Sequence, residues 1–68
     1  MKRSFIEKFV STKIRVLASL NHWDNEIENY LLARSGEIVD EIIKRRYTSE
    51  EMVQNIDGLV DDIALGIE

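Results

Sequence analysis

Hydrophobic residues recur at helical spacing along the whole chain, and no stretch alternates apolar and polar positions as a β-strand would. Residues 24–46 stand out because, at about 100° per residue, their apolar positions form two stripes instead of one. One stripe holds Ile27, Tyr30, Leu31, Ile38 and Ile42. The other holds Leu32, Gly36, Val39 and Ile43. A helix with two apolar sides needs cover on both, so we expect the second stripe to face another molecule.

Signals for helix ends divide the chain into three predicted helices, over residues 4–20, 24–46 and 49–66. Ser4 with Glu7, and Thr48 with Glu51, have the spacing of a capping box, which satisfies unpaired backbone donors at the start of a helix. Asp24 is suited to cap the middle helix. The connections are short, so we expect neighbouring helices to run antiparallel.

Gly36 makes the middle helix ambiguous, because glycine inside a helix costs about 1 kcal/mol relative to alanine. Ser35 before it can start a new helix, but it has no Glu or Gln at the third following position. Both apolar stripes also continue in phase across the glycine. We therefore expect one long helix, with a fourth helix as the alternative if Gly36 breaks it. In the long helix, Gly36 would allow the close approach of another backbone.

The chain has 68 residues, which we interpret as one helical domain over 1–68. It is 44% apolar and has no cysteine, so helix packing and association are its routes to stability. Its longest uncharged run, Val16 to Trp23, is far shorter than the roughly 20 residues that span a bilayer. We expect a complete, cytoplasmic, all-α antiparallel bundle without a membrane segment or cofactor, completed by homodimerisation.

The net charge of −4 is divided unevenly along the chain. The first predicted helix is basic, while the residues after Glu50 are acidic and include no lysine or arginine. We expect these two helices to lie side by side or to face each other across a dimer. Lys13 is a polar residue at one of the heptad positions that are otherwise occupied by Ile6, Phe9, Val16 and Leu20. Such a lysine either fixes helix register or packs its stem and extends its ammonium to the edge.

The predicted homodimer interface combines the second stripe with two further residues. It comprises Leu32, Gly36, Val39, Ile43, Lys13 and Trp23. Trp23 and Tyr30 also match the first apolar stripe, so a place in the core is an alternative to a role as partner anchors.

Nucleic-acid binding as a dimeric transcriptional regulator is an alternative function. Its candidate residues are Lys2, Arg3, Lys8, Arg15, Lys44, Arg45 and Arg46. A helix-turn-helix with its recognition helix beginning near Ser49 is disfavoured, because Glu50, Glu51 and Asp57 would approach the phosphates. The basic first helix is the better candidate.

A second alternative is a Mg²⁺-dependent phosphohydrolase that uses Glu37, Asp40 and Glu41. The E-x-x-D spacing is similar to that with which some all-α nucleotide pyrophosphohydrolases hold Mg²⁺. Such a site needs a second acidic pair, and Glu26 and Glu28 are two residues apart, so they cannot share one helical face.

The single histidine, His22, lies near Asp24, where it could act as a general base, but a lone histidine in a turn beside a helix cap is usually a polar loop residue. The sequence therefore favours a small non-catalytic interaction module. We expect a regulator, adaptor or inhibitor that presents a helical surface to another protein.

Overall fold

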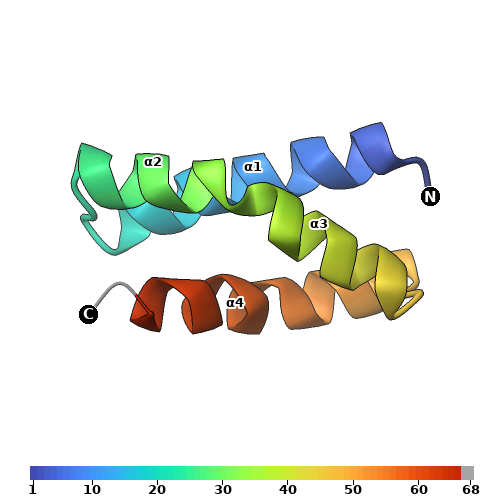
Figure 1. The fold of residues 1–68 in the computed structure, drawn as a ribbon. Coiled ribbons are helices and arrows are strands. Elements are labelled where there is room, and N and C mark those ends of the chain that lie inside the picture. The colour runs from blue at the N-terminus through green and yellow to red at the C-terminus, as the bar shows by residue number, and fades with distance from the viewer. Residues whose placement is uncertain (67–68) are drawn as a thin grey trace.

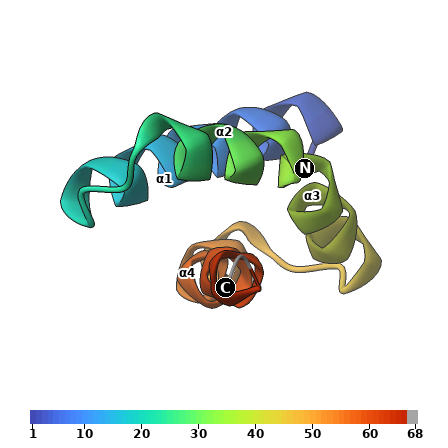
Figure 2. The same cartoon turned by 60° about the vertical axis from the view of Figure 1, so that its left-hand side comes forward.

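A computed structural model describes residues 1–66, and these residues form four helices and no strand. The helices are α1 (Arg3–Leu20), α2 (Asn25–Ala33), α3 (Ser35–Lys44) and α4 (Ser49–Leu65). In Figure 1, α2 runs antiparallel to α1, and α3 leaves α2 in a new direction. Helix α4 then returns toward the end of the bundle where α1 ends, but it crosses α1 steeply, since Figure 2 shows α4 end-on while α1 lies lengthwise. The expected all-helical class is confirmed for these residues. Glu68, which belongs to the acidic segment, lies outside them.

The middle helix is interrupted at Arg34, so the prediction of one continuous helix is wrong. Arg34 has φ −97° and ψ 4°, outside the α-helical well, and separates α2 from α3. The break precedes Gly36, which lies inside α3. A side chain built on Gly36 would meet nothing within 4 Å, so no backbone approaches it closely within the chain.

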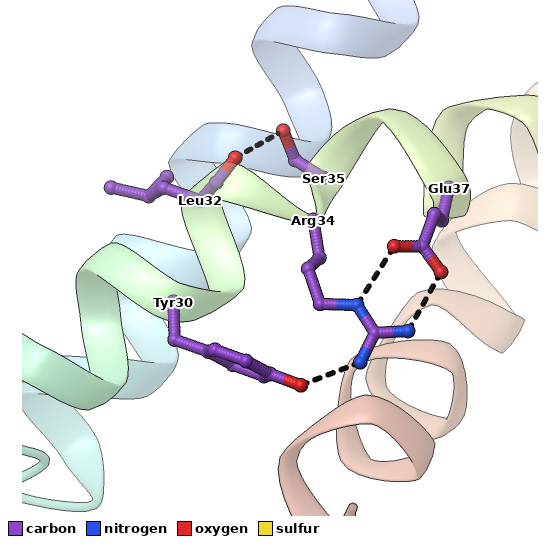
Figure 3. Close-up of polar contacts among 5 residues, drawn as sticks. All are labelled: Tyr30, Leu32, Arg34, Ser35 and Glu37. Carbon is purple, nitrogen blue, oxygen red and sulfur yellow. Dashed lines mark hydrogen bonds and ion pairs between the residues drawn. The ribbon is translucent and has the colours of Figure 1, made fainter. Parts of the chain in front are cut away.

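Side chains on both sides of the break hold the bend (Figure 3). The Arg34 guanidinium donates through Nε and Nη2 to the Glu37 carboxylate, at 2.7 and 2.8 Å. Its Nη1 donates to the Tyr30 hydroxyl at 2.6 Å, and the guanidinium lies 5.5 Å from the Tyr30 ring centroid. The Ser35 hydroxyl donates to the Leu32 carbonyl at 2.7 Å, a local bond of the kind that bends helices. Arg34 thereby bridges the last turn of α2 and the first turn of α3.

Two connecting turns, over residues 21–24 and 45–48, have the same construction. His22 and Arg46 adopt the left-handed conformation, with φ of 55° and 54°. The next residue in each turn is aromatic, and the Trp23 and Tyr47 amides donate back to carbonyls in the preceding helix. This pattern is a Schellman motif, and both aromatic side chains pack against the core.

The last residue of each turn caps the next helix. The Asp24 carboxylate accepts from the Ile27 amide at 3.0 Å, as expected. Thr48 and Glu51 form the predicted capping box at the start of α4. The predicted box at Ser4 is wrong, because α1 begins at Arg3 and its N-cap residue Lys2 makes no side-chain hydrogen bond to the helix.

The core lies between α1 and the other three helices. Its buried residues are Ile6, Val10, Ile14 and Ala18 of α1, Leu31 of α2, Ile38, Val39 and Ile42 of α3, and Met52, Ile56 and Val60 of α4. The turned view in Figure 2 shows α3 beside the N-terminal half of α1 and α4 below both. The four residues of α1 are spaced four apart, so its buried face drifts by about 40° with each step. This drift follows its neighbours, because α1 contacts α2 and α3 in turn.

Two ion pairs join α1 to the other elements. Arg3 contacts Asp40 of α3 at 2.9 Å, and Lys13 contacts Asp57 of α4 at 3.1 Å. The basic first helix therefore contacts the acidic last one within a single chain. This is one of the two arrangements that the charge pattern predicts.

Candidate protein interaction surface

The predicted interface stripe is largely used within the chain. Val39 is only 1% exposed, and Leu32 is half-buried against the core. Gly36 and Ile43 remain exposed, Ile43 to 43%. The assignment of Val39 to an interface is therefore corrected, because it cannot meet a second molecule without leaving its own core. The bend at Arg34 leads to the burial of Val39, since it turns α3 against α1 and places Val39 between the two helices.

Within residues 1–66, exposed large apolar side chains gather on α1 instead. Phe5, Val16 and Leu20 are 53%, 45% and 71% exposed, and Phe9 is half-buried beside them. At about 100° per residue these side chains fall on one side of α1, next to its buried face. We call Phe5, Phe9, Val16 and Leu20 the α1 strip.

Helix α4 extends this surface. The Lys13–Asp57 pair shows which sides of α1 and α4 are adjacent. One turn before Asp57 on α4, Val53 lies on nearly the same side of that helix and is 58% exposed. Two turns beyond Asp57, Ala64 is half-buried on the same side of α4. We call the α1 strip together with Val53, Asp57 and Ala64 the α1–α4 face.

The heptad of the first helix groups Phe9, Val16 and Leu20 with Ile6, but of these four only Ile6 is buried. A competing signal is present in the sequence. Ile6, Val10, Ile14 and Ala18 form an uninterrupted series of small and branched apolar residues four apart, and it is this series that the fold buries. Of the remaining apolar residues of α1, Phe9 and Leu17 are partly covered by the core, and Phe5, Val16 and Leu20 stay exposed.

The two other predicted interface residues lie at different places. Lys13 borders the α1–α4 face, with 31% of its side chain exposed and its ammonium on Asp57. Trp23 is half-buried in the turn before α2 and packs against the core. Trp23 therefore fills the role of a core residue, which was the alternative, and Tyr30 uses its hydroxyl to hold Arg34.

The candidate nucleic-acid residues do not form one continuous patch. Arg3 pairs with Asp40, and Arg45 donates to Glu41 at 2.7 Å and to the Tyr47 hydroxyl at 3.0 Å. The remaining ones are exposed and belong to two places. Lys2 directly precedes α1, and Lys44 and Arg46 lie at or just after the end of α3, which Figure 1 places at the end of the bundle where α1 begins. Lys8 and Arg15 lie along α1. Acidic residues at the start of α4 share the first of these places, because Ser49 contacts Met1 at 3.4 Å.

The three carboxylates of the predicted metal motif do not converge. Glu37, Asp40 and Glu41 each bind a different arginine, at 2.7, 2.9 and 2.7 Å. Within residues 1–66 no three acidic or histidine side chains are placed to hold one metal ion. Glu37 and Glu41 line a shallow groove of about 340 Å³ between α3 and α4, together with Asp62. His22 is exposed in its turn.

These arginine pairs set the protonation of the groups concerned. Hydrogen bonds from Arg34 hold the pKa of Glu37 below its ordinary value, and the same bonds raise the pKa of Arg34. The pKa of Arg45 is raised by its hydrogen bonds to Tyr47 and then to Glu41. All three groups are therefore charged at neutral pH, and they act as structural ion pairs rather than as acids or bases.

No protein-family model matches this chain, and neither a curated protein nor a solved structure matches it significantly. Within residues 1–66, no helix has the length and apolar character needed to cross a membrane.

Proposed function

We propose that this protein is a non-catalytic, cytoplasmic protein–protein interaction module that works as a homodimer through its α1–α4 face. A regulator, adaptor or inhibitor of this kind recognises its partner by helix-on-helix contact. The observation that carries the proposal is the alignment of Phe5, Val16 and Leu20, each about half exposed or more, on one side of α1. Isolated exposed apolar residues are common, but an aligned group marks an interaction surface.

The size of this surface sets the strength to expect. Covering a half-exposed Phe, Val or Leu side chain contributes roughly 1 kcal/mol, about half the value for complete burial. The α1 strip and Val53 on two copies then contribute about 10 kcal/mol, against roughly 4–15 kcal/mol for the lost freedom of association. We therefore expect a dimer that dissociates on dilution rather than a permanent one.

Light scattering on a sizing column, over a range of concentrations, tests the proposal. We expect the wild-type chain to approach twice its 7.9 kDa mass as concentration rises. Leu20→Glu places a charge in the α1 strip and should keep the chain monomeric. Ile43→Glu is the matched control, because Ile43 is an exposed apolar residue of the stripe first predicted as the interface, and it should leave dimerisation unchanged.

Circular dichroism of both variants checks that they remain helical. A wild-type monomer at all concentrations would contradict the proposed homodimer. Loss of the dimer in Ile43→Glu but not in Leu20→Glu would instead place the interface on α3.

A further inference from the structure

We propose that the second copy packs its α1 antiparallel on α1 of the first, with a two-fold axis that crosses the helix pair between Thr12 and Lys13. This inference rests on the proposed function, and it adds the direction and register in which the two copies meet. It follows from three observations: the symmetric spacing of the α1 strip, the place where α4 crosses α1, and the charges at the two ends of α1.

The apolar residues of the α1 strip are spaced symmetrically along the helix. Phe5 and Phe9 are four positions apart, Val16 and Leu20 are also four apart, and seven positions lie between Phe9 and Val16. In a two-fold interface, each contact between two different residues occurs twice, once in each direction. An axis between residues 12 and 13 therefore places Phe5 opposite the partner's Leu20, and Phe9 opposite the partner's Val16. Every apolar side chain of the strip is then covered by one from the other copy.

Helix α4 leaves room for this contact, because it crosses α1 steeply (Figure 2). It borders the strip where Lys13 meets Asp57 at 3.1 Å, near the middle of α1, and the strip's ends at Phe5 and Leu20 stay exposed. Lys13 is one residue from the proposed axis, and its ammonium lies on Asp57. Two ion pairs, rather than two unpaired cations, therefore meet beside the axis. A single polar residue in an apolar seam fixes the register of two helices, and Lys13 is placed to do so.

The charges at the two ends of α1 favour antiparallel over parallel packing. The start of the helix carries Lys2 and Lys8, which are exposed and have no ion-pair partner within residues 1–66. The segment after its end carries Asp24, Glu26 and Glu28, and residues 16–33 contain neither lysine nor arginine. Antiparallel packing brings each basic end to the partner's acidic end, whereas parallel packing opposes like charges at both ends.

The bases along α1 lie outside the contact. Lys8 and the partner's Arg15 approach each other on the side away from α4, but both lie about 90° or more around the helix from the middle of the strip. They remain exposed at the edge of the interface, where water and salt screen their repulsion. The apolar seam and the charges at the helix ends therefore decide the direction of packing.

Single cysteines test the direction of packing, because the chain has none of its own. Thr12 and Ser19 are exposed, and they lie on the same side of α1, about 20° apart around the helix. In the proposed dimer the two thiols of Thr12→Cys lie beside the axis, offset along the helix by about 2 Å, whereas those of Ser19→Cys are about 20 Å apart. With diamide as the oxidant, Thr12→Cys should form a disulfide-linked dimer at least about tenfold faster than the matched control Ser19→Cys. Non-reducing gel electrophoresis measures both rates.

A charge exchange between Phe5 and Leu20 tests the register. Both side chains are exposed and neither packs against the core, so substitution there should leave the helical signal in circular dichroism intact. Phe5→Glu and Leu20→Lys should each raise the dimer dissociation constant at least about tenfold, because an unpaired charge then enters the apolar seam. In the variant that carries both, each new acid faces a new base of the partner. Its dissociation constant, measured by light scattering, should be lower than that of either single variant.

A parallel pair gives different results. Its axis runs along α1, so every residue lies level with its own copy, and Phe5 is far from the partner's Leu20. Equal or absent cross-linking of the two cysteine variants, or a double charge variant that dimerises no better than the single ones, would overturn the antiparallel arrangement. If Leu20→Glu still abolished the dimer, the proposed function would stand without this arrangement. A wild-type chain that stays monomeric would overturn both.

Discussion

Helix α1 and the central segment, which comprises α2 and α3, both carry more apolar residues than one helical face holds. The central segment bends at Arg34, and its apolar residues enter the core from two short helices with different directions. Helix α1 is uninterrupted and buries a single drifting face. Its remaining apolar side therefore stays exposed as the α1 strip. A bend lets one chain use two apolar stripes, while an unbroken helix presents its second stripe to solvent or to a partner.

The largest effect is expected from a comparison of substitutions at two valines, one in the core and one on the α1 strip. Val39→Asp puts a charge into the core between α3 and α1, where it has no partner, and we expect it to destabilise the fold by several kcal/mol. In a 68-residue domain this should abolish cooperative unfolding. Val16→Asp places the same charge on the α1 strip and should leave the helical signal intact. Circular dichroism and chemical denaturation at a concentration that keeps the chain monomeric measure both. Equal damage from the two substitutions would contradict the contrast.

A smaller effect is expected at the glycines of α3 and α4. Gly36 and Gly58 both lie inside helices, and a Cβ atom added to either would have nothing within 4 Å, so alanine should fit without strain. Gly36→Ala and Gly58→Ala should each stabilise the chain, by up to about 1 kcal/mol, because alanine favours the helix. The less regular start of α3 should make the gain smaller at Gly36. Denaturant unfolding measures the gain, and light scattering should show the same dimer mass for both variants.

Gly58→Ala serves as the control for Gly36→Ala. A Gly36→Ala variant that dimerises less well than Gly58→Ala would mean that a partner's backbone does approach Gly36. The central segment would then be an interface after all, and the contrast with α1 would fail.

The smallest expected effect concerns the bend itself. Because Arg34 lowers the pKa of Glu37 in the folded chain, their pair stabilises the fold above the ordinary glutamate pKa of about 4.3. This stabilisation is lost as pH falls through the lowered folded value. Glu37→Gln should lower the melting temperature slightly at pH 7, and the difference should shrink as pH falls from 5 to 3. Both side chains are well exposed, so the effect is small.

The control is a double-mutant cycle with Arg34→Met. In that background Glu37→Gln should have no pH-dependent effect, because the guanidinium that lowers the pKa is gone. A pH-dependent difference that persists without Arg34 would assign the stabilisation to another group.

Local sequence determined the helical class and most helix ends. Thr48 with Glu51, and Asp24 before α2, predict caps that depend on residues within three positions, and the structure has both. The prediction of a helix start at Ser4 is wrong because Lys2 and Arg3 before it are also compatible with a helix. The first helical turn therefore begins earlier than the capping pattern indicates. The sequence shows which short-range capping hydrogen bonds can form, but it does not show which of several possible helix starts the chain uses.

Tertiary structure decided which apolar residues are left over. The two stripes of residues 24–46 and the apolar side of α1 are all present in the sequence. Which of these apolar residues are buried depends on the bend at Arg34 and on the placement of α3 against α1. The bend is held by hydrogen bonds from Arg34 to the Glu37 and Tyr30 side chains. Burial is a property of pairs of helices, and a helical pattern describes one helix at a time. For this reason the sequence indicates that an apolar surface exists, whereas only packing assigns it to α1 and α4.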